Sequence, residues 1–116
     1  MVEKGVTFIN VIELPADEVD TFVEQWRERA KLMRDAPGFR DSRLHRAKLP
    51  DARFQLVNVA HWDSVEAWET ATTNPAFQTA IRGVPGVVAP NPAIYDVVVE
   101  YEQPQARTCH QCGVKP

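Results

Sequence analysis

The sequence of 116 residues has only two cysteines, no long apolar run and no excess of basic charge. Cys109 and Cys112 both fall near the end of the chain, where a disulfide could not cross-link a core, and this usage favours a reducing cytoplasm. No segment approaches the roughly 20 apolar residues of a membrane-spanning helix, so no membrane partner is expected. With 13 basic against 16 acidic residues, no nucleic-acid partner is expected either. The first ten residues also lack the pattern of a secretory signal.

The rest of the composition predicts one globular domain. Phenylalanine, tyrosine and tryptophan together number 5 + 2 + 3 = 10, and they stand among regularly spaced aliphatic residues, which excludes a disordered chain. We expect this domain to span residues 1–102 and residues 103–116 to form a flexible tail. The tail's Cys109-His110-Gln111-Cys112 offers at most three ligands where zinc takes four, so we predict neither a metal site nor a cofactor there.

Hydrophobic periodicity predicts the order β-α-β-β-α-β. Strands are expected at residues 6–14, 39–47, 54–62 and 93–102. A helix between the first two strands ends at Pro37-Gly38. The second helix is expected in two pieces, one opened by a capping box at residues 63–66 and one by Asn74-Pro75. This order is that of the α+β class with a ferredoxin-like fold, a four-stranded antiparallel sheet with its helices on one face.

The first helix carries an apolar stripe with spacings of three and four residues. Its members are Val19, Phe22, Val23, Trp26, Ala30 and Met33. The residues between them, including Arg29, are assigned to the solvent-facing side. On the second strand, the basic residues Arg43, His45 and Arg46 are interpreted as edge residues paired with helix carboxylates, and the alternative is a contact with an acidic or phenolic substrate at the mouth of a cleft. Residues 83–92 contain three prolines and two glycines and predict a loop over one edge of the domain, with the option of covering a cleft.

Several strands are apolar on both faces, although the helices can cover only one face of the sheet. The uncovered face would carry Ile9, Val11, Val57, Val59 and Val98. Leaving so much β-branched surface in water would cost several kcal/mol at about 25 cal/mol per Å². We therefore predict a homodimer, a dimeric α/β barrel in which the two sheets face each other.

Two asparagines occupy positions that strand alternation turns toward the helices. Asn58 shares its face with Ala60 and Trp62, and Asn10 lies between Phe8 and Ile12. A buried carboxamide is costly unless both of its ends are hydrogen-bonded, so either these residues cap local turns and bulges or they open into a cleft. Amide donors beside an indole suit the binding of an electron-rich aromatic and the stabilisation of its anion, and they suit hydrolysis poorly.

Four segments resemble the antibiotic-biosynthesis monooxygenase (ABM) family. They are FINVIEL, PGF at residues 37–39, LVNVAHWDS at residues 56–64 and NPAF at residues 74–77. The pattern is most similar to the cofactor-independent anthrone oxygenases of aromatic polyketide pathways. This resemblance implies a dimeric ferredoxin-like barrel that binds a small aromatic substrate and O₂ between sheet and helices and uses no metal, flavin or haem. It also implies catalytic roles for Asn10, Asn58 and Trp62.

The resemblance extends to residues that would contact the substrate. These expected binding residues are Phe22, Trp26, Trp68, Phe77 and Arg82. Trp68 stands where family members carry a tyrosine. Some members have an arginine on the last helix, where this chain has Ile81, and Arg82 is the neighbouring candidate.

Two other functions remain open at this stage. One is a dimeric barrel that binds a small aromatic without oxidising it, or a polyketide cyclase that does not use O₂. The other is haem degradation, known in the same superfamily, which would require an axial histidine on the last helix. The corresponding segment here, NPAFQTAIRG, contains no histidine.

Overall fold

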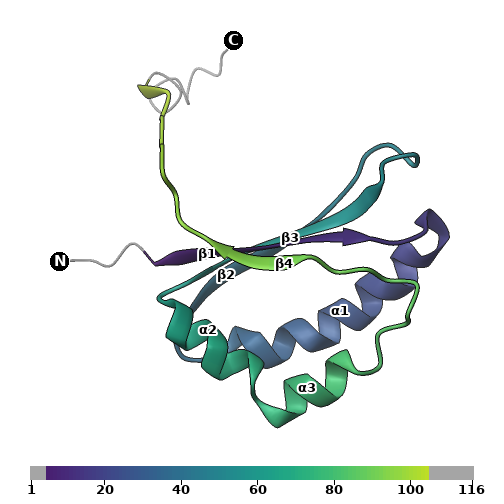
Figure 1. Cartoon of the computed structure of the whole chain (residues 1–116), viewed down its shortest axis with the longest axis horizontal. Helices are drawn as coiled ribbons and strands as arrows, with labels where there is room; N and C mark the ends of the chain where they lie inside the picture. Colours follow the sequence, from purple (N-terminus) through teal and green to yellow (C-terminus); the bar gives the residue numbers. More distant parts are fainter. Residues whose placement is uncertain (1–4, 105–116) are drawn as a thin grey trace, which may run out of the picture.

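The computed structural model describes residues 5–104 (Figure 1). Its elements are β1 (Val6–Glu13), a short 3-10 helix η1 (Ala16–Glu18), α1 (Val19–Arg34), β2 (Phe39–Arg46), β3 (Phe54–Trp62), α2 (Val65–Thr72), α3 (Pro75–Ile81) and β4 (Pro92–Tyr95). This order confirms the predicted β-α-β-β-α-β arrangement, with the second helix in two pieces. Cys109 and Cys112, for which we predicted neither a metal site nor a cofactor, lie outside the residues that the structure describes.

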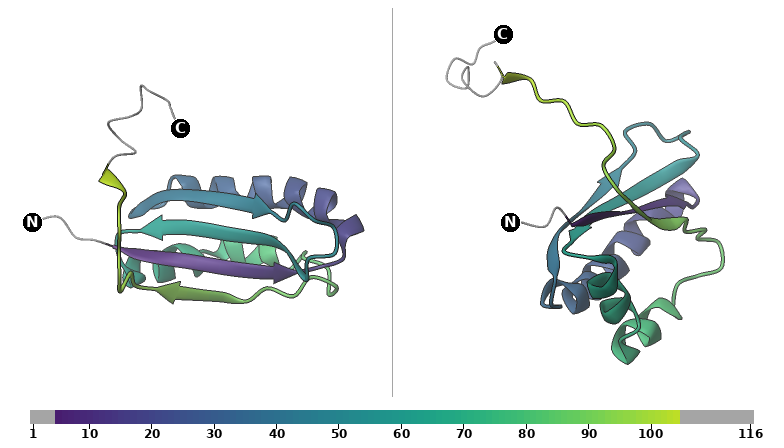
Figure 2. Two further views of the ribbon diagram at one scale, coloured as in Figure 1. Left: turned by 90° about the horizontal axis from the view of Figure 1, so that it is seen from above. Right: turned by 60° about the vertical axis from the view of Figure 1, so that its left-hand side comes forward.

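The four strands form one antiparallel sheet in the order β2-β3-β1-β4, the arrangement of a ferredoxin-like α+β fold. All three α-helices lie against the same face of the sheet (Figures 1 and 2). No element within residues 5–104 covers the opposite face, which we call the outer face. None of the helices in that range has the length and apolar character required to cross a membrane.

Polar side chains begin both short helices. Ser64 caps α2 by accepting a hydrogen bond from the backbone N–H of Ala67 at 3.1 Å, so the cap lies one residue later than the capping box predicted from the sequence. Asn74 caps α3 by accepting from the backbone N–H of Ala76 at 2.8 Å, and Pro75 follows as the first helical residue, as expected.

The hydrophobic core consists of two clusters under the sheet. One contains the buried Ile12, Leu14, Val19, Phe22, Leu56 and Val88. The other contains the buried Ala60, Trp62 and Ala71, with partly buried aromatic residues around them. The first cluster lies at the Ile12–Leu56 end of the β1–β3 pair and the second at the Val6–Trp62 end. The core is thus divided between the two ends of this strand pair.

The last strand is much shorter than predicted. We expected residues 93–102, but β4 ends at Tyr95. Tyr95 pairs with Thr7, one residue from the start of β1, so the chain has no further partner strand to follow. Residues 96–104 instead run away from the sheet on the side opposite the helices (Figures 1 and 2). Val98 and Tyr101 are consequently 90% and 91% exposed.

The turn before β2 requires glycine at position 38. Gly38 has φ 87°, and a Cβ there would approach Ala67 Cβ of α2 to 2.5 Å. Its carbonyl oxygen also accepts a hydrogen bond from Asp63 N at 2.8 Å, which ties the turn to the end of β3. This close approach explains the glycine of the Pro37-Gly38-Phe39 motif.

We predict that Gly38→Ala lowers the free energy of unfolding by about 1–3 kcal/mol, because it adds left-handed backbone strain to a steric clash. Chemical denaturation measures this change. Gly86→Ala is the matched control, because a Cβ at Gly86 would meet no atom within 4 Å. Equal stabilities of the two variants would contradict the assignment.

Candidate functional site

A cavity of about 490 Å³ lies between the sheet and the helices. Its volume is in the range of small-molecule sites. The strands contribute Phe8, Asn10, Ile12, Phe39, Ser42, Asn58, Ala60, Trp62 and Pro92. The helices contribute Phe22, Trp26, Arg29, Ala30, Met33, Trp68, Thr72, Phe77, Gln78 and Ile81, and the loop before β4 adds Val84, Val88 and Pro90.

Asn10, Asn58 and Trp62 all line this cavity. Asn10 and Asn58 are direct cross-strand partners in the β1–β3 register, so their carboxamides start from adjacent positions on the helix-facing side of the sheet. Trp62 lies on the same face four residues further along β3, about 13 Å away at the usual rise per residue. The structure thus brings together the polar residues that sequence alternation placed on one face.

The two carboxamides have their oxygen atoms already occupied. Asn10 Oδ1 accepts a hydrogen bond from the backbone N–H of Asn91 at 2.8 Å, and a backbone N–H can only donate, which fixes the orientation of the amide. Asn58 Oδ1 accepts from the hydroxyl of Ser42 at 2.8 Å. Within the described range, every fully buried polar side-chain atom has a hydrogen-bond partner. The NH₂ groups of Asn10 and Asn58 have no partner in that range, so they are not fully buried. They remain available to donate to a ligand.

Trp62 forms one end of an aromatic lining. Its ring packs edge-on against Phe39, with ring centroids 5.2 Å apart, and the side chain is only 2% exposed. Within residues 5–104 no acceptor bonds to its indole N–H, so this nitrogen is not fully buried. At the same end, Trp68 lies 5.8 Å from Phe8 between ring centroids. These rings give a planar aromatic ligand several faces to stack on.

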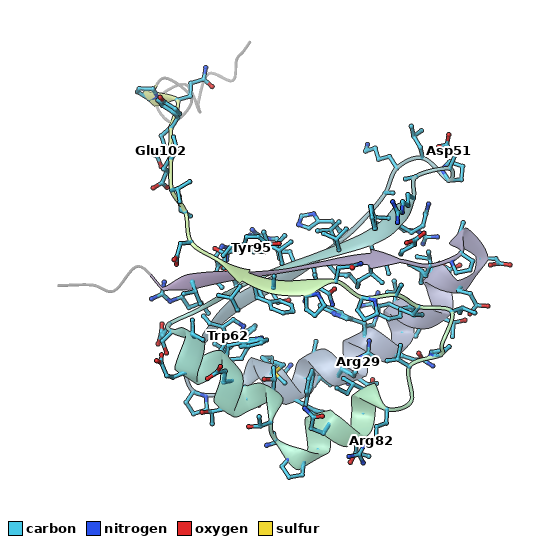
Figure 3. The ribbon with its side chains drawn as sticks, in the orientation of Figure 1. Arg29, Asp51, Trp62, Arg82, Tyr95 and Glu102 are labelled. Carbon is cyan, nitrogen blue, oxygen red and sulfur yellow. The ribbon has the colours of Figure 1, made fainter. Side chains whose placement is uncertain are left out.

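The other expected binding residues divide into two groups. Phe22, Trp26 and Phe77 line the cavity with Trp68. Arg82 does not line it: its side chain points away from the sheet, beyond the end of α3 (Figure 3). The C-cap position of Arg82 turns it outward, since α3 ends at Ile81 and Ile81 takes the place facing the cavity.

Arg29 is the charged residue that the sequence analysis misplaced. We assigned it to the solvent-facing side of the first helix, but it is half-buried and lines the cavity. Figure 3 shows Arg29 on α1 within the helix layer, whereas Arg82 lies at the far end of α3, away from the sheet. Burial lowers the pKa of Arg29 below the ordinary value for arginine. The helical spacing indicates this cavity-facing position, because Arg29 follows Phe22 by seven residues and Trp26 by three, which places all three on one helix face.

The loop over residues 83–91 forms one wall of the cavity and is fastened to β1. Glu13 and Ala89 exchange backbone hydrogen bonds of 3.0 and 2.8 Å. The side-chain amide of Asn91 donates to the carbonyl oxygen of Val11 at 2.9 Å, while its backbone N–H holds Asn10. Sequence reasoning did not identify Asn91, because an asparagine between two prolines is also typical of an ordinary turn.

The lining within the described range contains no histidine, carboxylate, cysteine, tyrosine or lysine. His61 projects from the outer face, where its Nδ1 lies 2.6 Å from Asp41, as alternation along β3 predicted. Arg46 on β2 pairs at 2.8 Å with Asp20 of α1, as expected for that basic residue. Arg43 and His45 make no ion pair within residues 5–104, so for them the expected pairing is wrong. No group of three or more potential metal ligands occurs among residues 5–104. The arrangement can therefore donate hydrogen bonds to an anionic oxygen and stack aromatic rings, but its lining offers no carboxylate or imidazole base.

Solved structures similar to this chain include three relevant proteins. A provisionally assigned monooxygenase from Shewanella loihica PV-4 shares 31% identity over 86% of this chain and 99% of its own, with a TM-score of 0.73. SnoaB, a cofactor-independent oxygenase from Streptomyces nogalater, shares 21% identity over 84% and 97%, with a TM-score of 0.70. The haem degrader MhuD from Mycobacterium tuberculosis shares 25% identity over 84% and 99%, with a TM-score of 0.63. None of the curated proteins compared with the sequence matches it significantly.

Fold and cavity together define a ferredoxin-like α+β domain with a mainly apolar cavity between the sheet and the helices. The sequence profile of the family described as "Antibiotic biosynthesis monooxygenase" matches residues 5–83, a span that includes β1, both asparagines and Trp62. The chain belongs to this family, as its sequence motifs indicated.

The cavity makes a direct prediction for Ala60, which lies on β3 between Asn58 and Trp62 and faces the open space. Ala60→Leu would fill part of the space and weaken binding of a planar tricyclic probe, 2-(hydroxymethyl)anthraquinone, by roughly 10- to 100-fold. Quenching of tryptophan fluorescence measures this binding, because all three tryptophans of the chain line the cavity. Val59→Leu, one residue away on the outer face, should bind like the wild type; equal weakening by both variants would place the probe elsewhere.

Proposed function

We propose that this protein is a cofactor-independent monooxygenase that uses O₂ to oxidise an electron-rich, anthrone-like polycyclic aromatic to a quinone. The observation that carries the proposal is the pair of carboxamides, Asn10 and Asn58. Their oxygens are held by Asn91 and Ser42, which leaves their N–H groups to donate into a cavity of aromatic walls. Membership of the monooxygenase family supports the reaction class. In this proposal the protein acts in the cytoplasm, in the biosynthesis of an aromatic polyketide.

The proposed reaction begins when the substrate loses a proton from its central methylene and becomes a delocalised enolate. The amides of Asn10 and Asn58 donate hydrogen bonds to the enolate oxygen and so stabilise this anion. Since the cavity lining offers no carboxylate or imidazole base, the proton passes to water, and the stabilised anion lowers the cost of that step. Aromatic stacking by Trp26 and Trp68 holds the rings in place.

The enolate then transfers one electron to O₂, which gives a substrate radical and superoxide. These two recombine by forming one C–O bond, and a proton completes the hydroperoxide. Loss of the remaining methylene hydrogen as a proton and cleavage of the O–O bond release water and leave the new carbonyl. One oxygen atom enters the quinone, the other leaves as water, and both methylene hydrogens are consumed. In this proposal the Trp62 N–H donates a hydrogen bond to the peroxide oxygen.

We predict that Asn58→Ala lowers kcat for the oxidation of dithranol by roughly 100-fold, the usual effect of removing one donor to a developing oxyanion. Trp62→Phe keeps an aromatic ring but loses the indole N–H, and should also lower kcat. Oxygen uptake measures both rates, and chemical denaturation of each variant verifies that the fold is retained.

His61→Gln is the control, since His61 lies on the same strand but faces away from the cavity. Its rate should equal that of the wild type, and wild-type rates in Asn58→Ala and Trp62→Phe would refute the catalytic assignment. Tight binding of the tricyclic probe by the wild type without oxygen uptake would identify the protein as a binder of aromatics or a cyclase instead.

Haem degradation fits the residues less well, although MhuD shares the fold. Proteins hold haem iron mainly through histidine, cysteine or tyrosine, or through methionine together with histidine. Among the described residues that line the cavity, Met33 is the one side chain of this kind, and it has no histidine to act with. α3, where the resemblance would require an axial histidine, contains none.

We also propose that the protein is a homodimer in which two outer faces pack together. Ile9, Val11, Val57 and Val59 lie on that face, are only half-buried and have no covering element within residues 5–104. The segment after β4 leaves the sheet on this same side (Figure 1) and carries Val98, which is 90% exposed. A second copy of the chain would cover both apolar surfaces at once, because its sheet meets the valine-rich face and its body meets the projecting segment.

Light scattering after size-exclusion chromatography tests this assembly, with a mass near twice 13.1 kDa as the expected result. Val59→Asp places a charge at the centre of the outer face and should yield the monomer. Val65→Asp is the matched control, because Val65 is an exposed residue at the start of α2, where a carboxylate is favourable. A wild-type protein of 13.1 kDa at micromolar concentration would refute the dimer.

A further inference from the structure

Arg29 is the one charged side chain among the described residues that line the cavity. Its neighbours one helical turn away are Gln25 and Trp26 on one side and Leu32 and Met33 on the other, none of which carries a charge. The facing helix α3, with the sequence PAFQTAI, has no charged residue either. The guanidinium therefore projects into surroundings that offer it no carboxylate.

The contacts of Arg29 confirm that its charge is not neutralised by the described chain. Its guanidinium carbon lies 5.0 Å from the centroid of the Phe22 ring, which supports the group by a cation–π contact. No ion pair of Arg29 occurs within residues 5–104, whereas Arg27 and Arg34 on the same helix pair with Glu24 and Asp35. Burial without a partner disfavours the charged form and lowers the pKa of Arg29.

Arg29 also lines a shallow groove on the seam between α1 and α3, together with Glu28 and Ala80. The carboxylate of Glu28 is engaged by Lys31 at 3.2 Å and does not serve Arg29. Arg29 thus stands in the helix layer, opposite the sheet that carries Asn10 and Asn58 (Figure 3). A ligand in the cavity would meet amide donors on one side and an unpaired cation on the other.

We propose that Arg29 binds an anionic substituent of the substrate, a carboxylate, so that the preferred substrate is a polycyclic aromatic acid. The proposal rests on the proposed function in taking the cavity's occupant as the substrate. The guanidinium presents a planar fork of donors that matches a carboxylate, and the ligand supplies the missing negative charge. The amides then hold the enolate oxygen of the reacting ring while Arg29 holds the acid group at the α1–α3 seam, which fixes the orientation of the rings.

The test compares two probes of nearly the same shape, anthraquinone-2-carboxylate and the neutral 2-(hydroxymethyl)anthraquinone. Tryptophan fluorescence gives the dissociation constant of each with the full-length protein at fixed ionic strength. The wild type should bind the carboxylate roughly 10- to 100-fold more tightly than the neutral probe, the range of a charge-assisted hydrogen bond. Arg29→Met should reduce this ratio to about one, and Arg29→Lys should restore part of it.

Arg27→Met is the matched control, because Arg27 is an exposed arginine on the same helix. The ratio of the two dissociation constants in Arg27→Met should equal that of the wild type. Arg29→Met should also leave the melting temperature unchanged or raise it, since the substitution removes an unpaired, partly buried charge. A wild-type ratio near one, or a ratio unchanged in Arg29→Met, would overturn the proposal. A lower melting temperature with weaker binding of both probes would overturn it as well, because that result marks a purely structural role.

These results separate the two proposals. Oxygen uptake with dithranol but no preference for the carboxylate would overturn the role of Arg29 and leave the proposed function standing. A carboxylate preference that depends on Arg29, without oxygen uptake, would support the anion site and overturn the monooxygenase function.

Discussion

The register between β1 and β3 is the constraint on which the whole site depends. It sets Asn10 directly opposite Asn58 and keeps Trp62 on the same face. Because side chains alternate along a strand, a slip of one residue in either strand would turn its asparagine to the outer face and bring a valine or isoleucine inward. The buried Ile12 and Leu56, which are also cross-strand partners, stabilise this register by packing under α1. Core packing and site geometry are therefore fixed by the same strand pairing.

The site combines strong polar groups with an apolar lining by satisfying one end of each amide within the protein. Ser42 on β2 and Asn91 before β4 lie at opposite edges of the central strand pair, and each holds one carboxamide oxygen. This arrangement limits the cost of burying the amides and leaves their N–H groups without a partner among residues 5–104. A preorganised pair of donors needs no rearrangement when negative charge develops on a ligand, which is the physical basis of the proposed catalysis.

Most of the fold and much of the site could be predicted from periodicity. Alternation placed Asn10, Asn58 and Trp62 on one face, and the structure places them in one cavity. The extent of the last strand could not be predicted, because β propensity at residues 97–99 does not show whether a partner strand is present. Tyr95 already pairs with Thr7, one residue from the start of β1. Arg29 was misplaced because its charge was given more weight than its helical position. Asn91 acts through backbone contacts that a sequence pattern does not record.

The hydrogen bonds between the 83–91 loop and β1 couple the position of this wall to the orientation of Asn10. Asn91 links that loop to the strand through Val11 and, with its own backbone N–H, orients Asn10. A displacement of residues 83–91 away from β1 would break the hydrogen bond that orients the Asn10 carboxamide. The two are thus coupled: whatever loosens residues 83–91 from β1 also frees the Asn10 side chain to rotate, and refastening the loop restores its orientation.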